Sequence, residues 1–306
     1  MAGRTWSTSR RLEFIDFRLY WQGRINRRDL REMFTISAPQ AANDLRAYQE
    51  AAPGNAVYDR RIKTYLAGES FRPRFFRPDA AEYFEHLRRS RRRDERSGQA
   101  WVAADVPFAV SPIVKRRMDP EIVRSVMLAI RRKQCLRVHY QSMTRARPRV
   151  RIISPHAVAS DEFRWHARAY SHERAAYRDF VLARILKATV ANEPYVDGSH
   201  DHAWHETVTV RLSTNPDLEP AQRRAYEFDL GMTDGALGVP VRRALLHYFL
   251  TEMRLDFDPA GEKPPRVTPL VVVNVEEIRA SLSPDRAATE SRTDVAEGHG
   301  SGGRCD

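Results

Sequence analysis

The sequence predicts an α+β protein of several domains, on three observations. The chain has 306 residues, a length that corresponds to two or three domains. Apolar residues recur mainly at helical spacing before Leu136 and alternate like those of β-strands after it. Beyond residue 200, strand-like and helix-like segments alternate, which is typical of a small α/β sandwich.

The composition is that of a globular cytoplasmic protein. With 42% hydrophobic and 30% charged residues, the chain is neither collagen-like nor wholly disordered. No apolar run approaches the ~18 residues that span a bilayer, and the N-terminus lacks the apolar region of a secretory signal. Cys135 and Cys305 are too few for a disulfide framework or a four-cysteine zinc site. We therefore expect no membrane segment.

Positive charge is concentrated in the first two thirds of the chain. Residues 1–100 carry 21 basic and 13 acidic side chains, residues 101–200 carry 18 and 9, and residues 201–306 carry 12 and 18. Of the 51 basic residues 46 are Arg, whose planar fork suits phosphate and guanine edges. Codon bias explains the Arg-to-Lys ratio but not the asymmetry. The first 200 residues are therefore expected to bind a polyanion.

The first 78 residues are expected to form three helices and a hairpin. Asn26 caps the second helix, and after a three-residue turn Ser37 and Gln40 match a capping box at the start of the third. Two β-prone stretches between residues 56 and 65 flank a basic turn. Helix, turn, helix and basic hairpin form the winged helix-turn-helix arrangement, which binds DNA. The alternative is a small helical bundle with a solvated polar face.

In a winged helix the third helix offers polar side chains to base edges, and surrounding basic residues contact phosphates. The residues predicted to contact DNA are Arg24, Arg27, Arg28, Ser37, Pro39, Gln40, Asn43, Arg46, Arg60, Arg61 and Lys63.

Residues 79–134 are expected to form a helical linker. Residues 80–96 are strongly basic. Such a run is usually a solvated helix face or a disordered arm, and the alternative is that it extends the surface that contacts phosphates. Asp119 as N-cap and Pro120 at the first helical position start a further helix.

Residues 135–200 are expected to form a small, strongly bent sheet or barrel of four or five strands. Strand-like alternation covers 136–140, 150–153, 163–170 and 177–185, with a bend at residues 154–156. Trp165 is assigned to the core, because Phe163 and Ala167 on its face are apolar. The other face combines Arg, His and aromatic residues, a combination suited to phosphate and stacked bases.

Residues 201–282 are expected to form the small α/β sandwich, with strands at 208–212 and 267–275 and helices at 220–228 and 241–253. Its acidic character favours dimerisation over nucleic-acid binding. Residues 283–306 are rich in Ser, Gly, Ala and charge, and are expected to be a disordered tail.

Neither a metal site nor an enzyme is predicted. The cluster His200, Asp201, His202, His205 and Glu206 offers metal-ligand types, but its spacing matches no H-E-x-x-H site and a solvated connector is the better interpretation. No G-x-S-x-G, Walker or dinucleotide-binding motif occurs, and no carboxylate pair stands out. We expect no catalytic residue and no cofactor.

Four segments together resemble a WYL domain: Tyr140-Gln141-Ser142, Ser154-Pro155-His156, Arg164 to Tyr170 and Tyr177 to Ile185. The triplet that gives the family its name stands here as Trp165-His166-Ala167, a departure at two of three positions. That departure resembles the BrxR/CapW-type group of regulators from bacterial phage-defence operons. N-terminal segments are similar to the same group, and they include Arg24-Ile25-Asn26-Arg27, Ile36 to Ala41, Asp44-Leu45, Tyr58-Asp59, Lys63-Thr64-Tyr65 and Phe71-Arg72-Pro73.

The resemblance covers about residues 8–282. It implies a winged helix-turn-helix, an Sm-like β-barrel WYL domain and a C-terminal extension, which work as a homodimeric repressor on an inverted-repeat operator in duplex DNA. It also implies that the WYL domain senses a nucleotide or nucleic-acid ligand. The predicted ligand pocket consists of Tyr140, Ser142, His156, His166, Arg168, Tyr170, Arg178 and Arg184.

Three alternatives stay open at this point. Arg178 and Arg184 can instead pair with Asp179 and nearby carboxylates, with His156 satisfied in a turn. The barrel can be the working part of an RNA- or single-strand-binding module. The same fold also serves transcriptional activators, because activation or repression depends on where the operator lies.

Overall fold

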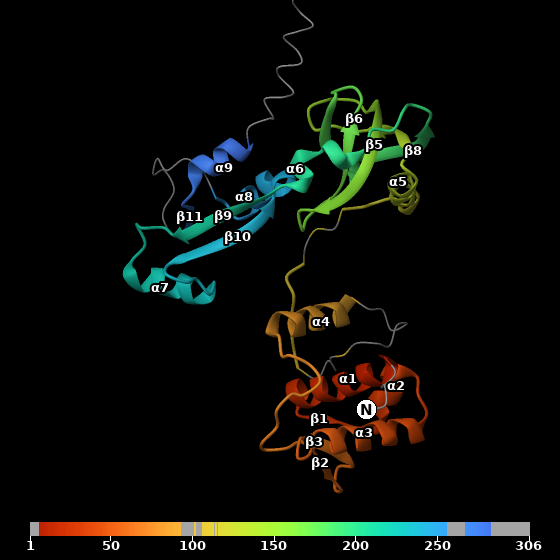
Figure 1. Cartoon of the computed structure of the whole chain (residues 1–306), viewed down its shortest axis with the longest axis vertical. Helices are drawn as coiled ribbons and strands as arrows, with labels where there is room; N and C mark the ends of the chain where they lie inside the picture. The colour runs from red at the N-terminus through yellow and green to blue at the C-terminus, as the bar shows by residue number, and fades with distance from the viewer. Residues whose placement is uncertain are drawn as a thin grey trace, which may run out of the picture. The chain divides into compact units, whose positions relative to one another are not determined.

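The computed structural model describes residues 6–92, 101, 106–112, 114, 116–255 and 267–282. The chain divides between Pro112 and Ile113 into two units, which we describe separately (Figure 1). The predicted disordered tail, Cys305, and Arg93 and Arg96 of the basic run lie outside the described residues. Within the described part, no helix is long and apolar enough to cross a membrane.

The first unit is a winged helix-turn-helix, as the sequence predicted. Its sheet has the antiparallel order β1-β3-β2. The elements are α1 (Trp6–Gln22), β1 (Arg24–Ile25), α2 (Arg27–Phe34), α3 (Ala38–Ala51), β2 (Ala56–Asp59), β3 (Thr64–Ala67) and α4 (Ala80–Arg92). The core between the helices is formed by buried residues that include Leu12, Ile15, Leu30, Leu45 and Tyr48.

Helix N-caps explain where α2 and α3 begin. The side chain of Asn26 accepts from the backbone N–H of Asp29 at 3.0 Å, and the Asp29 carboxylate accepts from the N–H of Asn26 at 2.8 Å. Ser37 caps α3 by accepting from the Gln40 N–H at 3.3 Å. The predicted return bond from the Gln40 side chain is wrong, because that amide donates to Asp44 instead.

A buried carboxylate ties the segment after the wing to α1. Asp16 is fully buried and accepts from the Tyr48 hydroxyl and from the backbone N–H groups of Arg74 and Phe75, at 2.5 and 2.7 Å for the latter two. Asn55 adds bonds in both directions to the Arg72 backbone. These contacts fix the base of the hairpin that carries β2 and β3.

The second unit begins with α5 (Pro120–Arg132) and a five-stranded antiparallel sheet of order β7-β6-β5-β4-β8. The strands are β4 (Cys135–Tyr140), β5 (Arg149–Ser160), β6 (Trp165–Ser171), β7 (Ala176–Val181) and β8 (Ile185–Ala191). Asp119 caps α5 as predicted, and the buried Ile122, Val126 and Ala129 pack it against the sheet.

Three details of this sheet differ from the sequence prediction. Strand β5 extends beyond the predicted strand 150–153 to Ser160, and the predicted bend at residues 154–156 is a bulge between Pro155 and Ala157 within it. The predicted strand 177–185 stops at Val181 and is followed by a short 3-10 turn before β8. Trp165 is 48% exposed rather than buried, since it pairs with Ser160 at the end of the β5–β6 ladder, away from the core around Ala167.

The remainder of the second unit is a small α/β layer with the sheet order β10-β9-β11. Its core includes Val210, Leu212, Leu246, Leu250 and Ile278. The elements are two 3-10 turns, η2 (Gly198–His200) and η3 (Arg243–Leu245), with α6 (His202–His205), β9 (Thr207–Thr214), α7 (Pro220–Asp229), β10 (Ala236–Arg242), α8 (Leu246–Glu252), β11 (Leu270–Val272) and α9 (Val275–Leu282).

Two of these elements were missed in the sequence. The predicted helix 241–253 starts only at Leu246, because residues 236–242 pair with β9 as β10. The predicted strand 267–275 shortens to β11 and is followed by α9. The Asp234-Gly235 pair, in which both residues have positive φ, is the turn signal that could have revealed β10.

Candidate nucleic-acid interface and effector pocket

Helix α3 separates a buried face from an exposed polar face. Ala41, Leu45 and Tyr48 are fully buried against the core, whereas Asn43 and Arg46 are exposed. The other predicted DNA-contacting residues lie at the start of α3, around α2 and in the hairpin of β2 and β3, which we call the wing. Of the eleven, ten are exposed and only Gln40 is half-buried.

Gln40 is held by a buried ion pair beneath α3. Its side-chain amide donates to Asp44 at 3.0 Å, and the same carboxylate accepts from Arg11 at 2.7 and 3.1 Å. Asp44 is 2% exposed, so this contact fixes the direction of the Gln40 side chain. Asn43 and Arg46 are the residues that α3 presents to solvent without that restraint.

The wing carries exposed Arg60, Arg61 and Lys63 at its turn. Arg27 and Arg28 stand exposed in the first turn of α2, where Arg28 bonds to Glu32 at 2.5 Å. Exposed guanidinium and ammonium groups around a polar helix have the chemistry needed to contact phosphates on both sides of a groove. Their contacts with DNA stay predictions.

In the second unit, Arg168 of β6 lies at the centre of a buried charge network. Its guanidinium donates to both carboxylate oxygens of Asp201, at 2.7 and 2.9 Å, and to Asp179 at 3.2 Å. Burial lowers the pKa of Arg168, but the bonds to Asp201 and the charge of Asp179 outweigh it and raise that pKa. Burial also raises the pKa of Asp201, and Arg168 and His156 reverse this and hold it well below its usual range.

Aromatic rings surround this network. His156 bonds to Asp201 at 3.0 Å and packs edge-on against Tyr177 and Trp204, with ring centroids 5.6 and 5.8 Å away. Tyr170 lies against Tyr177 at 5.3 Å. His156, Arg168 and Tyr170, three residues of the predicted pocket, therefore belong to one neighbourhood.

His166 lies in a second buried contact. It is 1% exposed, bonds to Asp161 at 3.2 Å and packs its ring 4.9 Å from that of Tyr248 on α8. The Tyr248 hydroxyl in turn donates to Asp179 at 3.1 Å. Tyr248 thus connects the C-terminal layer to His166 and to Asp179, which is a partner of Arg168.

The structure does not bring the other predicted pocket residues to Arg168. Tyr140 accepts from the Val181 N–H and packs on Phe180, and Ser142 bonds within its own loop. Arg178 pairs in register with Ala169, so it lies on the opposite face from Asp179, the cross-strand partner of Arg168. Arg184 is half-buried in the 3-10 turn before β8.

Sequence reasoning missed the carboxylates of this site. Asp201 was noticed only within the His/Asp cluster, yet it is 2% exposed, accepts from Arg168 and caps α6. Among the described residues, no group of three His, Cys, Asp or Glu side chains is arranged to hold a metal ion. The alternative left open by the sequence paired Asp179 with Arg178 or Arg184, whereas the structure pairs it with Arg168.

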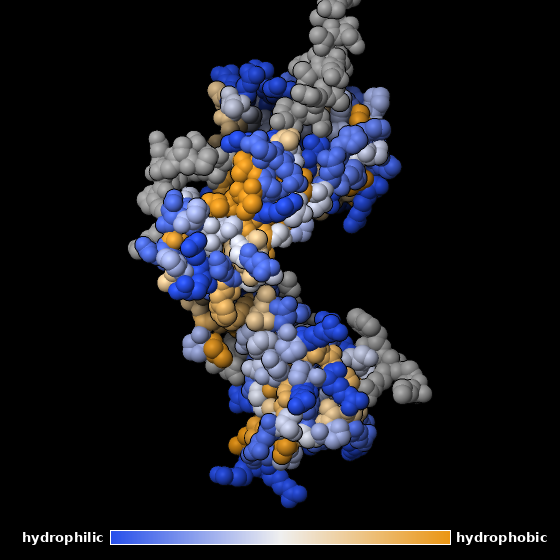
Figure 2. All heavy atoms as spheres, turned by 60° about the vertical axis from the view of Figure 1, so that its left-hand side comes forward, coloured by the Kyte–Doolittle hydropathy of each residue, from blue (hydrophilic) through white to orange (hydrophobic). Residues whose placement is uncertain are grey.

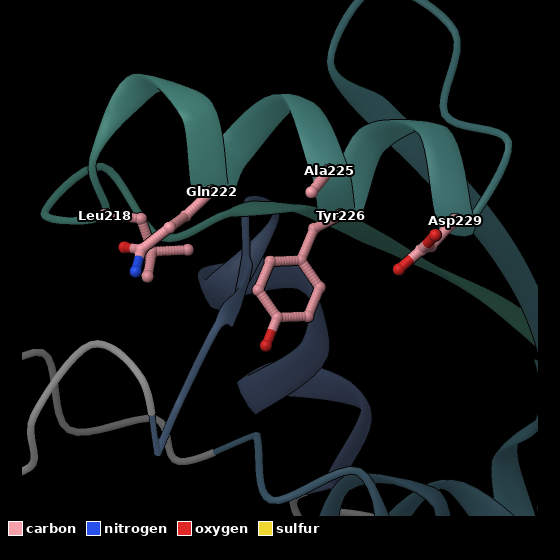
Figure 3. A pocket seen from close by; sticks show the side chains of 5 residues that line it. All are labelled: Leu218, Gln222, Ala225, Tyr226 and Asp229. Carbon is pink, nitrogen blue, oxygen red and sulfur yellow. The ribbon is translucent and has the colours of Figure 1, made fainter.

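The C-terminal layer contains a cavity of about 480 Å³ along α7, lined by Leu218, Gln222, Ala225, Tyr226 and Asp229 (Figure 3). The labelled side chains project from one side of α7 and from the loop before it. None of the α7 residues is fully buried, and Phe228 is 88% exposed. Helix α7 therefore has an apolar surface that the described residues leave uncovered.

Three family models match the chain in the order of its domains. Residues 7–89 match the BrxR transcriptional regulator winged helix-turn-helix domain, residues 121–190 the WYL domain, and residues 207–278 the BrxR transcriptional regulator C-terminal dimerization domain.

Curated relatives match nearly the whole chain. Proteins named DNA-binding transcriptional repressor CapW are 39% identical in Pseudomonas aeruginosa (90% of this chain, 92% of the relative) and 39% identical in Stenotrophomonas maltophilia (92% and 94%). The one from Escherichia coli strain KTE188 is 36% identical (92% and 93%). The solved structure of proteasome accessory factor B/C of Arthrobacter aurescens is 17% identical with a TM-score of 0.25, covering 90% of this chain and 48% of that one, which supports no inference.

Proposed function

The chain belongs to the BrxR/CapW family of WYL-domain regulators, and from this premise we propose that it is a homodimeric transcriptional repressor that binds operator DNA. The observation that carries the proposal is the exposed polar face of α3 beside the basic wing. The name of the matched relatives supports repression over activation. The protein acts by binding and not by catalysis, in the cytoplasm at the nucleoid.

The winged unit reads the operator through α3. Asn43, Arg46 and the carboxamide of Gln40 contact base edges in the major groove, where Asn and Gln pair bidentately with adenine. The Arg and Lys residues around α2 and the wing contact phosphates and set the register. Because a two-fold symmetric dimer mirrors a two-fold symmetric site, the operator is an inverted repeat.

The C-terminal layer, residues 201–282, forms the dimer. The match of residues 207–278 to a dimerization domain supports a second copy as the occupant of the α7 surface. Exposed Phe228 is an aromatic anchor of the kind that dominates such interfaces. The cavity beside α7 is then a receptor for an apolar side chain of the other copy.

Residues 135–200 hold the effector, a nucleotide or nucleic-acid ligand that appears during phage infection, and the regulated genes are a phage-defence operon. His156, Arg168 and Tyr170 are the residues proposed for this site. Aromatic rings suit bases, and the Arg168 guanidinium binds phosphate only when it exchanges a carboxylate partner, Asp201 or Asp179, for the ligand. The effector releases DNA only if it binds the DNA-incompetent state more tightly. Helix α5, which belongs to the linker of residues 79–134, packs on this sheet. A movement of the sheet on effector binding would therefore displace α5 and, through the linker, the winged unit.

Fluorescence anisotropy on the full chain tests the repressor. DNA from upstream of its own operon is compared with scrambled DNA of the same composition at ~150 mM salt, because phosphate contacts are strongly salt-dependent. We expect upstream DNA to bind at least about 10³-fold more tightly. Equal affinity contradicts the proposal, and tighter binding of single-stranded competitor favours an RNA- or single-strand-binding module instead.

A further inference from the structure

The tip of the wing carries an apolar side chain among basic ones. Ile62 is 57% exposed, in the four-residue turn between β2 and β3 that projects beyond the helices of the first unit (Figure 1). At the lower end of the view in Figure 2, where Figure 1 places this hairpin, hydrophobic residues lie beside strongly hydrophilic ones. A single exposed apolar residue is ordinary on a protein surface, so its meaning depends on how it is held and what surrounds it.

The backbone holds Ile62 in a defined place. Asp59 accepts from the N–H groups of Arg61 and Ile62 at 2.8 and 3.3 Å, and the Thr64 hydroxyl donates to the Ile62 carbonyl at 3.1 Å. Lys63 adopts a left-handed conformation, with φ of 52°. The Ile62 side chain is mostly exposed, yet the backbone that carries it is preorganised.

A cross-strand aromatic pair stabilises the two strands of the wing next to its turn. Tyr58 and Tyr65 are cross-strand partners whose ring centroids lie 4.9 Å apart. Such aromatic pairs stabilise a two-stranded ribbon. The wing is therefore stiff enough to press its tip against a partner.

The basic residues beside Ile62 indicate that the partner surface is negatively charged. Arg60 and Arg61 precede Ile62 and Lys63 follows it, and all three are exposed. When these basic groups bind a polyanion, Ile62 is held against the surface of that polyanion. Apolar side chains flanked by cations are the composition of the wedges that proteins insert into the DNA minor groove.

Groove dimensions leave only the tip for base contact. A two-stranded ribbon fits the major groove, about 12 Å wide, whereas the minor groove, about 6 Å wide, must widen to admit one. Since α3 is assigned to the major groove, the wing meets the neighbouring minor groove, and only side chains of its turn reach base edges there.

We propose that Ile62 is an apolar wedge that enters the minor groove and partly unstacks one base step in each half-site. The inference rests on the proposed DNA binding and deepens it. The step it selects is a pyrimidine–purine step such as TA or CA/TG, because these unstack at the lowest cost. Ile62 thereby adds a preference for deformable DNA at a position that α3 does not read.

The test uses the full chain and operator duplexes in which 2-aminopurine replaces adenine at successive positions of the flanks. Its fluorescence rises when its neighbours unstack. We expect a rise at one step per half-site with the natural protein and with Ile62→Leu, and its loss with Ile62→Ser. Operator affinity of Ile62→Ser is expected to fall about tenfold or more, from the lost apolar burial. Circular-permutation gels then show a smaller bend.

Two controls separate the wedge from general effects. Val57→Ser removes an equally exposed apolar side chain of the wing, 55% exposed, away from its tip, and leaves the signal unchanged. Arg61→Ala weakens binding but keeps the signal at saturating protein. A natural protein that binds its operator without any rise, or an Ile62→Ser variant that keeps it, overturns the wedge while the repressor stands. Failure to prefer upstream over scrambled DNA overturns the repressor itself.

Discussion

Arg168 and Asp201 form a two-pronged ion pair, in which Nε and Nη2 of the guanidinium donate to the two carboxylate oxygens at 2.7 and 2.9 Å. The side chains are 9% and 2% exposed, so water screens the pair little. Asp201 also caps α6 by accepting from the Trp204 N–H. One carboxylate therefore connects strand β6 of the five-stranded sheet to the start of the C-terminal layer.

Asp201→Ala is expected to lower the free energy of unfolding by about 3 kcal/mol, because it leaves the buried guanidinium with Asp179 as its remaining carboxylate. Urea unfolding followed by circular dichroism measures this. The matched control is Asp197→Ala, whose exposed pair with Lys133 is expected to contribute much less than the buried pair. A loss no larger than that of the control contradicts the network.

Acid is expected to destabilise the second unit through the same carboxylate. The folded pKa of Asp201 lies below its usual 3.8, because Arg168 and His156 outweigh the effect of burial. Folding therefore favours the ionised form, and its contribution is complete above about pH 5 and is lost as the pH falls below about 4. Unfolding titrations between pH 7 and pH 2.5 should show this fall, and Asp201→Asn should flatten it. An unchanged slope in that variant assigns the acid transition to other groups.

Tyr248→Phe is expected to loosen the C-terminal layer from the five-stranded sheet. The variant keeps the ring that packs on His166 and removes the hydroxyl that donates to Asp179, a loss of about 1 kcal/mol. Hydrogen exchange of the amides in α8 and β7 measures the loosening. Tyr226→Phe on α7 serves as the control for removing a tyrosine hydroxyl, and equal exchange in the two variants would contradict the connection.

The winged unit was the most predictable part of the fold, because its boundaries are set by local chemistry. Asn26 and Ser37 satisfy backbone N–H groups within three residues of themselves, so a reader of the sequence sees both partners. The wing follows from two short β-prone stretches around a polar turn. Such short-range rules do not depend on the rest of the molecule.

The Arg168 network could not be predicted in the same way. Its partners Asp179 and Asp201 are 11 and 33 residues away, and strand register decides which arginine faces Asp179. A shift of one residue would have put Arg178 in that place. The sequence therefore indicated the residue types of the pocket but not which of its arginines is buried.

Phe228→Glu is expected to weaken the dimer. The substitution places a charge on the uncovered α7 surface, and a charge buried without a partner at an interface costs several kcal/mol. Sedimentation velocity across a range of protein concentrations measures the shift towards monomer. Phe163→Glu in the turn between β5 and β6, at a phenylalanine 53% exposed, is the matched control and should leave the dimer intact. If both variants remain equally dimeric, the dimer interface does not include the α7 surface around Phe228.

Operator recognition is expected to divide between α3 and the wing. Asn43→Ala removes a base contact, so it should weaken operator binding by about 1–3 kcal/mol and leave scrambled DNA unaffected. Arg60→Ala removes a phosphate contact, so it should weaken both DNAs alike and reduce the salt slope by about one. Anisotropy titrations at several salt concentrations separate the two effects, with exposed Arg137→Ala of the second unit as the control. If Asn43→Ala weakens both DNAs equally, α3 is a phosphate-binding helix and sequence is read elsewhere.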